Sequence, residues 1–155
     1  MSLLEHRPGK ALRLVFKAPV WLYRARLGWL LGNRFVYFAH VGRRTGARRE
    51  TVVEVVRHDA DEITVVSGYG ERADWYRNLK AAPPLEVRLG SHRYLHPDRR
   101  FLTDEQAINA LADYANRHPR AWRRLASAFG LPPDNDPEQL SQAVRRLRFV
   151  AFTRS

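Results

Sequence analysis

Short runs of hydrophobic and β-branched residues, separated by polar turns, occupy the middle of the chain. Residues 34–41, 49–57 and 62–67 have the composition and length of strands, and residues 58–62 supply polar turn chemistry between the second and third. The second run carries four valines, so we expect it to be partly buried on both faces. Because the connections are too short for parallel crossovers, the strands are predicted to pair antiparallel.

Two further strands and a hairpin follow the same pattern. Residues 85–89 form a strand-like run, residues 90–91 are a Gly-Ser pair that suits a two-residue hairpin turn, and the run 92–102 returns along it. Pro97 within the returning run indicates an edge or a bulge. Residues 147–152 form the last strand-like run.

Helical patterns with recognisable ends separate these strands. Asp74 and Asp136 are candidate N-caps, and Thr103 with Gln106 makes a capping-box pattern. We expect helices over 74–82, 104–117, 120–129 and 137–144. Six or so strands that run mostly as hairpins, with helices between them, favour an α+β fold built on an antiparallel sheet or small barrel.

The N-terminal segment, residues 1–32, is amphipathic. Its apolar run is interrupted by charged residues and lacks the roughly 18 uninterrupted apolar residues of a membrane span. Pro19 and Gly32 suit the start and stop of a helix in which Trp21 and Trp29 are flanked by arginines. Two interpretations stay open: the helix packs on its own domain, or it makes peripheral contact with anionic membrane.

Composition indicates one folded domain of 155 residues, with residues 33–155 as its core. The absence of cysteine excludes disulfides and thiolate metal sites, and the six histidines show no metal-ligand spacing, so we expect no metal. The net charge of +11 is unevenly distributed: residues 1–49 hold 11 Lys or Arg and one acid, whereas residues 50–155 hold 16 and 15. This asymmetry indicates an anionic partner near the first third of the chain.

The most concentrated positive charge lies between the first two predicted strands. Gly42 and Gly46 enclose two arginines and Thr45, and Arg49 begins the next strand. Glycine permits backbone conformations in which successive N–H groups point into one concavity, and arginine matches the geometry of phosphate and carboxylate. We therefore expect an anion site here; a basic turn in solvent is the alternative.

A second motif follows the third predicted strand. Residues 67–70, Ser-Gly-Tyr-Gly, leave room for a planar ligand to approach the backbone. Trp75 and Tyr76 then open a helix, where aromatic residues are more often core than site. Asn78 is harder to explain as core, because a buried amide needs hydrogen-bond partners.

Together, "GRRTGARRETVVEVV" and "VVSGYGERADWYRNLKAAP" resemble the deazaflavin-dependent nitroreductase family of oxidoreductases, which use coenzyme F420; the match covers about residues 34–90. The resemblance implies a split β-barrel related to FMN-binding barrels, mostly antiparallel, with an N-terminal helix and peripheral helices. It also implies that Ser67 is catalytic and that the cofactor contacts Arg43, Arg44, Thr45, Gly46, Arg49, Ser67, Gly68, Tyr69, Trp75, Tyr76 and Asn78.

F420 carries a phosphodiester and a glutamate tail, which suit a basic loop, and a deazaflavin ring that carries a hydride. The resemblance therefore implies hydride transfer from reduced F420 to a flat, electron-poor small-molecule acceptor: a quinone, an enone or a nitro compound. Ser67 would donate a hydrogen bond to the acceptor's oxygen. FMN, with a similar ring and an anionic tail, is the alternative cofactor.

Two other functions compete with this one. A lipid-binding split barrel without F420 would explain the N-terminal tryptophans, and a nucleic-acid-binding module would explain the basic first third. Residues 50–155 are nearly neutral and carry no nucleic-acid motif, so nucleic acid is disfavoured. We expect a cytoplasmic protein, at the inner face of the membrane if residues 1–32 bind lipid, and a homodimer is an open alternative because split barrels often pair.

Overall fold

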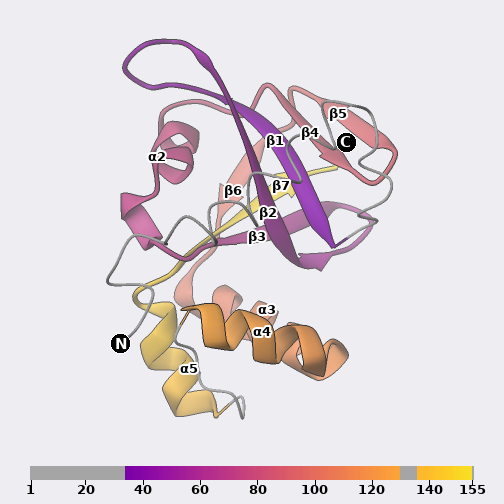
Figure 1. The fold of residues 1–155 in the computed structure, drawn as a ribbon, viewed down its shortest axis with the longest axis vertical. Helices are drawn as coiled ribbons and strands as arrows, with labels where there is room; N and C mark the ends of the chain where they lie inside the picture. The colour runs from indigo at the N-terminus through magenta and orange to yellow at the C-terminus, as the bar shows by residue number, and fades with distance from the viewer. Residues whose placement is uncertain (1–33, 130–135, 155) are drawn as a thin grey trace.

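The computed structural model describes residues 34–129 and 136–154 (Figure 1). Within these ranges one seven-stranded sheet has the order β5-β4-β1-β2-β3-β7-β6, and every neighbouring pair is antiparallel. The strands are β1 (Phe35–Val41), β2 (Arg48–His58), β3 (Glu62–Ser67), β4 (Glu86–Leu89), β5 (His92–Leu95), β6 (Arg99–Phe101) and β7 (Arg148–Thr153).

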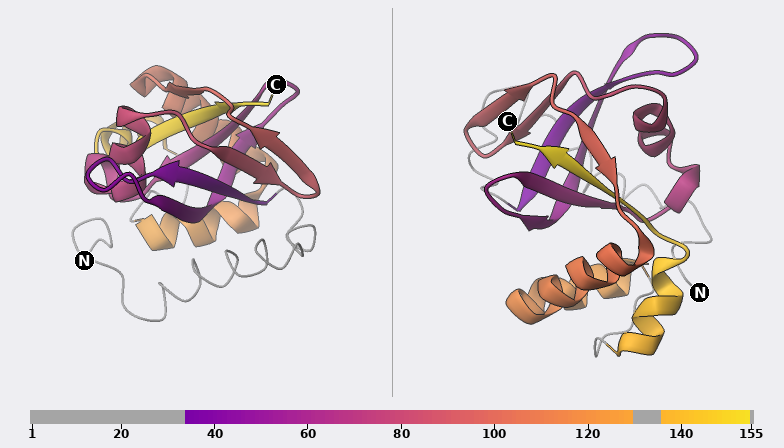
Figure 2. Two further views of the ribbon diagram at one scale, coloured as in Figure 1. Left: turned by 90° about the horizontal axis from the view of Figure 1, so that it is seen from above. Right: turned by 180° about the vertical axis from the view of Figure 1, so that it is seen from behind.

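The sheet curls until its two edges approach each other. β5 and β6 are the edge strands, yet only residues 96–98 connect them. Four residue steps from Leu95 to Arg99 reach at most about 14 Å, whereas the edges of a flat seven-stranded sheet would lie roughly 29 Å apart. The short connection therefore requires a barrel-like sheet, as Figure 2 shows from two directions. The expected α+β, antiparallel, split-barrel fold is confirmed.

In the described residues, four α-helices and a short 3₁₀ helix cover the sheet unevenly. The helices are η2 (Gly70–Arg72), α2 (Asp74–Ala81), α3 (Asp104–Arg117), α4 (Pro119–Phe129) and α5 (Pro137–Val144). α3, α4 and α5 gather at one end of the sheet, whereas α2 lies alone near the loop that joins β1 to β2 (Figure 1). The molecule therefore has a helix-covered end and a loop end.

Two main hydrophobic clusters match this division. One fills the barrel between the strands and α2, and includes Phe38, Leu79 and Phe152. The other joins α3, α4 and α5 to the sheet through Leu111 and Phe149. The two clusters lie on opposite faces of β2, β3 and β7, and the loop end, which adjoins α2, is positioned mainly by the cluster inside the barrel.

Most local predictions are confirmed. Thr103 and Gln106 form the expected capping box, and Asp136 accepts a hydrogen bond from the Gln139 backbone at 3.1 Å. The two-residue hairpin turn joins β4 to β5, and Gly90 has a φ of 61°, a conformation that favours glycine.

Two local predictions are wrong in detail. Asp74 is the first residue of α2 and not its N-cap; Ala73 is the cap, and no side chain caps this end. The run 92–102 was expected to form one returning strand, but it divides into β5 and β6 at opposite edges of the sheet. Pro97, buried between them, cannot donate a ladder hydrogen bond, which explains the division.

The predicted helix of residues 19–32 and its two interpretations lie outside the described residues. Among the helices that are described, none has both the length and the apolar character needed to cross a membrane.

Candidate functional site

The loop between β1 and β2 is closed by its own backbone. The Gly42 amide donates to the Ala47 carbonyl and the Gly46 amide to the Gly42 carbonyl, both at 2.8 Å. Gly46 has a φ of 72°, so the residue that turns the loop needs glycine. The Ala47 amide donates to Thr45 Oγ1 at 3.2 Å. These three amides bond within the loop and are not free to contact an anion.

The base of the loop is fastened to α2 by one amide side chain. Asn78 Oδ1 accepts from the Arg43 backbone N–H at 3.1 Å and from Arg43 Nη1 at 2.9 Å. Arg43 Nη2 also lies 3.4 Å from Asp74 Oδ1. Since Asn78 is buried, these bonds satisfy an amide that would otherwise be costly to bury. They bring together two motifs that are more than 30 residues apart in the sequence.

The same amide fixes the protonation of a buried histidine. Two donors on Arg43 identify the Asn78 oxygen, so its Nδ2 group faces His40 Nδ1 at 3.0 Å and donates to it. His40 therefore carries its proton on Nε2, which donates to Thr51 Oγ1 at 2.9 Å. Burial, with a smaller contribution from the Arg49 charge, lowers the pKa of His40 to about 4. The histidine is neutral near pH 7 and holds the loop without adding charge.

Strand alternation sends Arg48 and Arg49 to opposite faces of the β1–β2 hairpin. Arg49 is the cross-strand partner of His40, and residues directly opposite each other in a ladder share a face. Arg49 therefore lies on the face that carries His40 and looks toward α2. Arg48, one residue earlier, projects from the other face.

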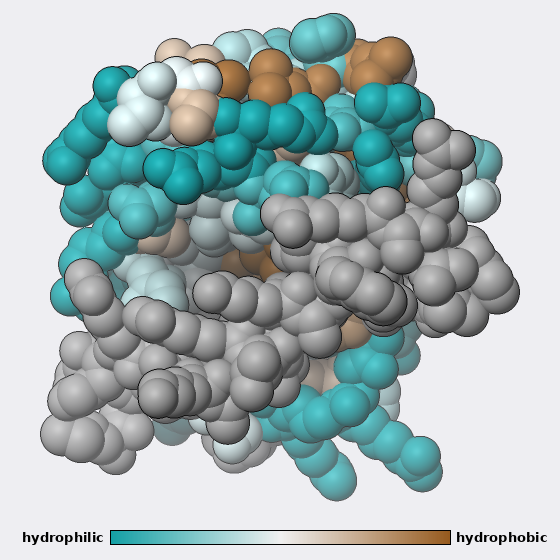
Figure 3. All heavy atoms as spheres, turned by 45° about the horizontal axis from the view of Figure 1, so that its top comes forward, coloured by the Kyte–Doolittle hydropathy of each residue, from teal (hydrophilic) through white to brown (hydrophobic). Residues whose placement is uncertain are grey.

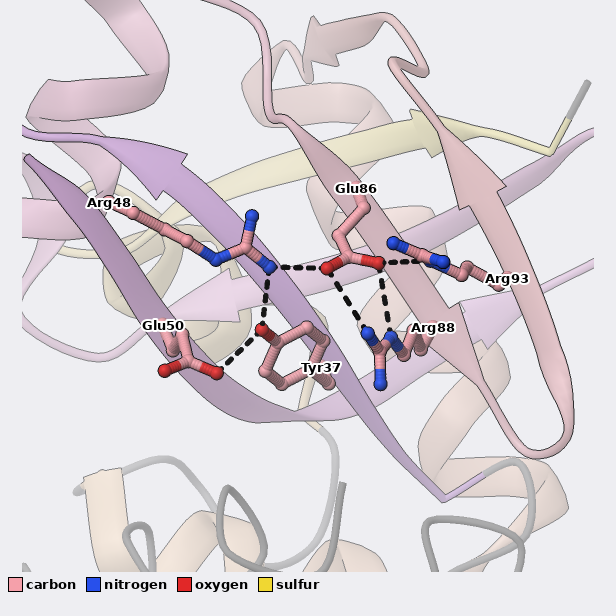
Figure 4. A network of polar contacts seen from close by, with 6 residues as sticks. All are labelled: Tyr37, Arg48, Glu50, Glu86, Arg88 and Arg93. Atoms are coloured by element: carbon pink, nitrogen blue, oxygen red, sulfur yellow. Dashed lines mark hydrogen bonds and ion pairs between the residues drawn. The ribbon is translucent and has the colours of Figure 1, made fainter. Parts of the chain in front are cut away.

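On that other face the arginines are paired with an acid within the protein. Arg48 Nη2 contacts Glu86 Oε1, and Arg93 and Arg88 donate to Glu86 Oε2 at 2.5 and 3.1 Å (Figure 4). Burial raises the pKa of Glu86, but the hydrogen bonds from the three arginines outweigh it and lower the pKa to about 2. Arg48 is thus part of a structural cluster, to which its Nη2 group is bound.

Tyr37 extends this cluster toward β2. Its hydroxyl donates to Glu50 Oε2 at 2.6 Å and accepts from Arg48 Nη2 at 3.2 Å (Figure 4). Burial, followed by the hydrogen bond to Glu50, raises the pKa of Tyr37 to about 12. The phenol stays protonated and serves as a structural link between the two acids and Arg48.

Arg44 and Arg49 differ from the other two arginines of the loop. Both are exposed, and neither side chain has a hydrogen bond or ion pair with another residue in the described ranges. Thr45 is exposed beside them. In Figure 3, where the upper end of Figure 1 is tilted forward, most of the visible described surface is hydrophilic. This end of the molecule thus offers uncompensated guanidinium groups to an anion.

The Ser-Gly motif forms a tight connection between β3 and α2. The Ser67 side chain is 1% exposed, and its hydroxyl donates to the Gly70 carbonyl at 2.9 Å. Gly70 has a φ of 59°, and a Cβ there would lie 2.5 Å from the Arg146 carbonyl, so only glycine fits. Gly68 and Tyr69 are half-buried. As the structure stands, the Ser67 hydroxyl is used to hold this connection.

The two aromatic residues at the start of α2 are placed differently. Tyr76 is buried and packs edge-on against Phe101, at 5.5 Å between ring centroids, so the core interpretation holds for it. Trp75 is half-buried and packs edge-on against Phe38 at 5.4 Å. Trp75 therefore retains accessible surface close to the loop, whereas the Tyr76 ring belongs to the core.

His40 is the main residue that sequence reasoning missed. The strand pattern did carry a signal for it: Val36, Phe38 and His40 alternate along β1 toward the barrel interior, and a histidine at an interior position needs polar partners. Those partners, Asn78 and Thr51, come from other elements, so the sequence did not identify them.

Comparison with known proteins defines first the class and then the family. The fold is that of a solved F420-H2-dependent reductase, FDR-A, with a TM-score of 0.50 at 19% identity, covering 78% of this chain and 95% of that one. Similar matches are a structure described as a domain-swapped dimer (TM-score 0.50, 18% identity, 86% and 98% covered) and a protein of unknown function from Agrobacterium tumefaciens (0.51, 14%, 87% and 54%). At these identities the matches show the fold alone.

The sequence itself establishes the family. A family model described as F420H(2)-dependent quinone reductase matches residues 16–126, and the chain belongs to this family. It is therefore an F420-dependent oxidoreductase, as the two motifs predicted. The residues at the loop end fit the cofactor, because Arg44 and Arg49 are exposed and free to pair with the phosphodiester or the carboxylates of F420.

Proposed function

We propose that this protein reduces a flat quinone-type acceptor with reduced F420 bound at the loop end of the barrel. Arg44 and Arg49 bind the anionic part of the cofactor, and Thr45 and Gly46 shape the turn between them. When bound, reduced F420 supplies the hydride. The observation that carries the proposal is the division of the loop arginines: Arg43 and Arg48 are bound within the protein, and Arg44 and Arg49 are not.

The residues that border the loop support a flat acceptor. Tyr69 and Trp75 are half-buried and pack against the barrel core, so each offers a rigid ring edge beside accessible surface. Flat conjugated acceptors stack well on such rings, and packing against them excludes water from the reacting atoms. A quinone fits these requirements and agrees with the family's description.

Ser67 is proposed to polarise the acceptor's oxygen, which requires its hydroxyl to turn away from the Gly70 carbonyl. The alternative role is structural, in which Ser67 only holds the connection between β3 and α2. The two roles differ in their consequences: a polarising donor affects turnover without cofactor affinity, whereas a structural hydroxyl affects folding stability and cofactor affinity together.

The direct test is turnover of reduced F420 with menadione, followed by the return of the oxidised cofactor's absorbance. We expect the parent protein to bind F420 with a micromolar or lower Kd, about −8 kcal/mol or better, measured by tryptophan quenching. Ser67→Ala should lower kcat roughly 100-fold with unchanged F420 affinity. Thr64→Val is the matched control, because it removes another buried hydroxyl of β3.

The outcomes separate the alternatives. Saturable binding of FMN but not of F420 would refute the cofactor assignment. Binding of F420 without turnover of menadione would point to another acceptor, for which an enone and a nitroaromatic are the next substrates to assay. Unchanged kcat in Ser67→Ala would remove Ser67 from the reaction.

A further inference from the structure

A pocket of about 740 Å³ lies at the helix-covered end, away from the loop. It opens between the last residues of β2 and the facing parts of α3 and α4. Its volume is in the range of small-molecule sites. Arg57, which lines it, is eight residues along β2 from Arg49, or about 26 Å in an extended strand. The loop and the helices α3 and α4 lie at opposite ends of Figure 1, so this pocket is separate from the cofactor site.

Positive charge dominates the pocket wall. Its five arginines come from four segments of the chain: Arg34, Arg57, Arg117, Arg120 and Arg124. Two of them have acidic partners: Arg34 Nη2 lies 3.5 Å from Glu54 Oε1, and Arg117 Nε lies 3.0 Å from Asp113 Oδ1.

The other three arginines form no ion pair with any residue in the part of the chain that the structure describes, and all three are exposed. Five arginines against two acids leave an excess of three positive charges around one concave surface. Residues 1–33 hold six Lys or Arg and one Glu, so that segment cannot supply the missing negative charge.

A solvated surface does not require this arrangement. Arginines that only promote solubility can point anywhere on a convex surface, where water screens them. Like charges that converge on a concave wall repel one another and focus a positive potential, which a bound anion relieves. The guanidinium groups also offer forked donors that match phosphate oxygens.

The pocket floor is apolar. Pro119, which is exposed, and Ala121, which is half-buried, line it together with the buried Val55, Val56 and Tyr114. The Tyr114 hydroxyl donates to Glu54 Oε1 at 2.7 Å, so no polar group of Tyr114 is left for a ligand, and its buried ring packs 5.5 Å from that of His118. A basic wall above an apolar floor suits an amphipathic anion and not a small inorganic ion.

We propose that this pocket binds a phosphate ester that carries an apolar body. The phosphate contacts Arg57, Arg120 and Arg124, and the apolar body covers the apolar part of the lining at Pro119 and Ala121. Such a group comes from one of two sources, a soluble phosphate monoester or the phosphate of an anionic lipid. The site is independent of the F420 loop.

The test is isothermal titration of phenyl phosphate into the full-length protein, with and without saturating F420. We expect saturable binding that F420 does not compete with. The double variant Arg57→Gln/Arg120→Gln should weaken it about tenfold or more, through lost charge-assisted hydrogen bonds. Arg123→Gln/Arg145→Gln removes the same charge outside the pocket and should change the Kd by less than about twofold; Arg123 is on α4 beside the pocket residues.

A second arm identifies the source of the phosphate. Co-sedimentation with vesicles of phosphatidylcholine and phosphatidylglycerol, lost in Arg57→Gln/Arg120→Gln and kept in the Arg123→Gln/Arg145→Gln control, would assign the site to lipid. Equal weakening in both double variants would mean diffuse surface charge and would overturn the proposal. Loss of phenyl phosphate binding on addition of F420, or no binding of either probe, would overturn it as well.

Discussion

Two neighbouring arginines on opposite faces of the β1–β2 hairpin differ in whether the guanidinium group has a partner within the protein. Arg48 projects to the face on which Glu86 contacts three guanidinium groups, so Arg48 is paired with an acid within the protein. Arg49 projects to the face of His40 and Asn78, where neutral hydrogen bonds hold the structure and the arginine remains exposed. Positive charge in a loop therefore says little about binding until the partner of each guanidinium group is known.

There is a physical reason for this difference between the two faces. A site that must bind an anion needs supports that do not compete with the ligand. His40 and Asn78 are uncharged, and they position the loop without offering a carboxylate to Arg49. Asp74, which is exposed, pairs with Arg43 at the base of the loop. The Glu86 face uses ion pairs instead, because its arginines only have to stabilise the fold.

The largest expected effect is on F420 affinity, when the two exposed arginines of the loop end are replaced. Arg44→Gln/Arg49→Gln should weaken F420 binding by about 3–6 kcal/mol, since two charge-assisted contacts are lost. The free energy of unfolding should stay within about 0.5 kcal/mol of the parent value, because both side chains are exposed. Tryptophan quenching and urea denaturation give the two values.

The matched control is Arg48→Gln, which removes an equal charge from the adjacent position. It should lower the unfolding free energy and leave the F420 Kd nearly unchanged. An F420 affinity that depended on Arg48 and not on Arg49 would contradict the assignment of the faces.

The next effect is a dependence of stability on pH. The folded-state pKa of His40, about 4, is below its unfolded value, so the unfolded chain binds more protons between pH 6.5 and 4. Stability is therefore complete above about pH 6.5 and falls by roughly 3 kcal/mol as the pH drops to 4. Urea denaturation at a series of pH values measures it.

His40→Gln should remove this dependence of the unfolding free energy on pH. The control is His58→Gln, which replaces an exposed histidine and should retain most of the dependence. The Glu86 cluster titrates lower: its contribution is present above about pH 4.5 and is lost as the pH falls toward 2, because its pKa is also depressed. A parent protein with constant stability between pH 6.5 and 4.5 would rule out a neutral, buried His40.

A smaller effect is expected on the structural face. Glu86→Gln keeps the shape of the side chain but leaves three arginines without their shared counter-charge, and we expect about 2 kcal/mol of destabilisation. The half-exposed state of Arg48 and Arg93 limits the cost, because water solvates the guanidinium groups that remain. F420 affinity should be unchanged; a tenfold loss would show that the two faces are coupled.

The smallest effect concerns Asp74. Its contact with Arg43 is long and its side chain is 85% exposed, so Asp74→Asn should change stability by less than about 0.5 kcal/mol. Loss of a true N-cap would cost about 1 kcal/mol, for comparison. Thermal denaturation distinguishes the loss of an exposed ion pair from the loss of an N-cap. Asp136→Ala is the control, because it removes a capping hydrogen bond that the structure shows.

The sequence alone determined the elements whose causes are local. The capping box at Thr103, the hairpin turn at Gly90 and the buried, valine-rich β2 all depend on residues close to one another in the chain. The two motifs that indicated F420 were also readable, because a Gly-rich basic turn and a Ser-Gly strand end are local patterns. That is why the family and the cofactor were predicted correctly.

Tertiary structure alone decided how the four loop arginines differ. No local pattern shows that Arg43 meets Asn78, that Arg48 meets Glu86, or that the Ser67 hydroxyl turns to Gly70 within a buried connection. The division of residues 92–102 between the two sheet edges likewise follows from barrel closure. In each case the deciding partner is brought close by the packing of other elements. Hydrogen bonds and ion pairs of this kind act over a few ångströms of space, whatever the separation along the sequence.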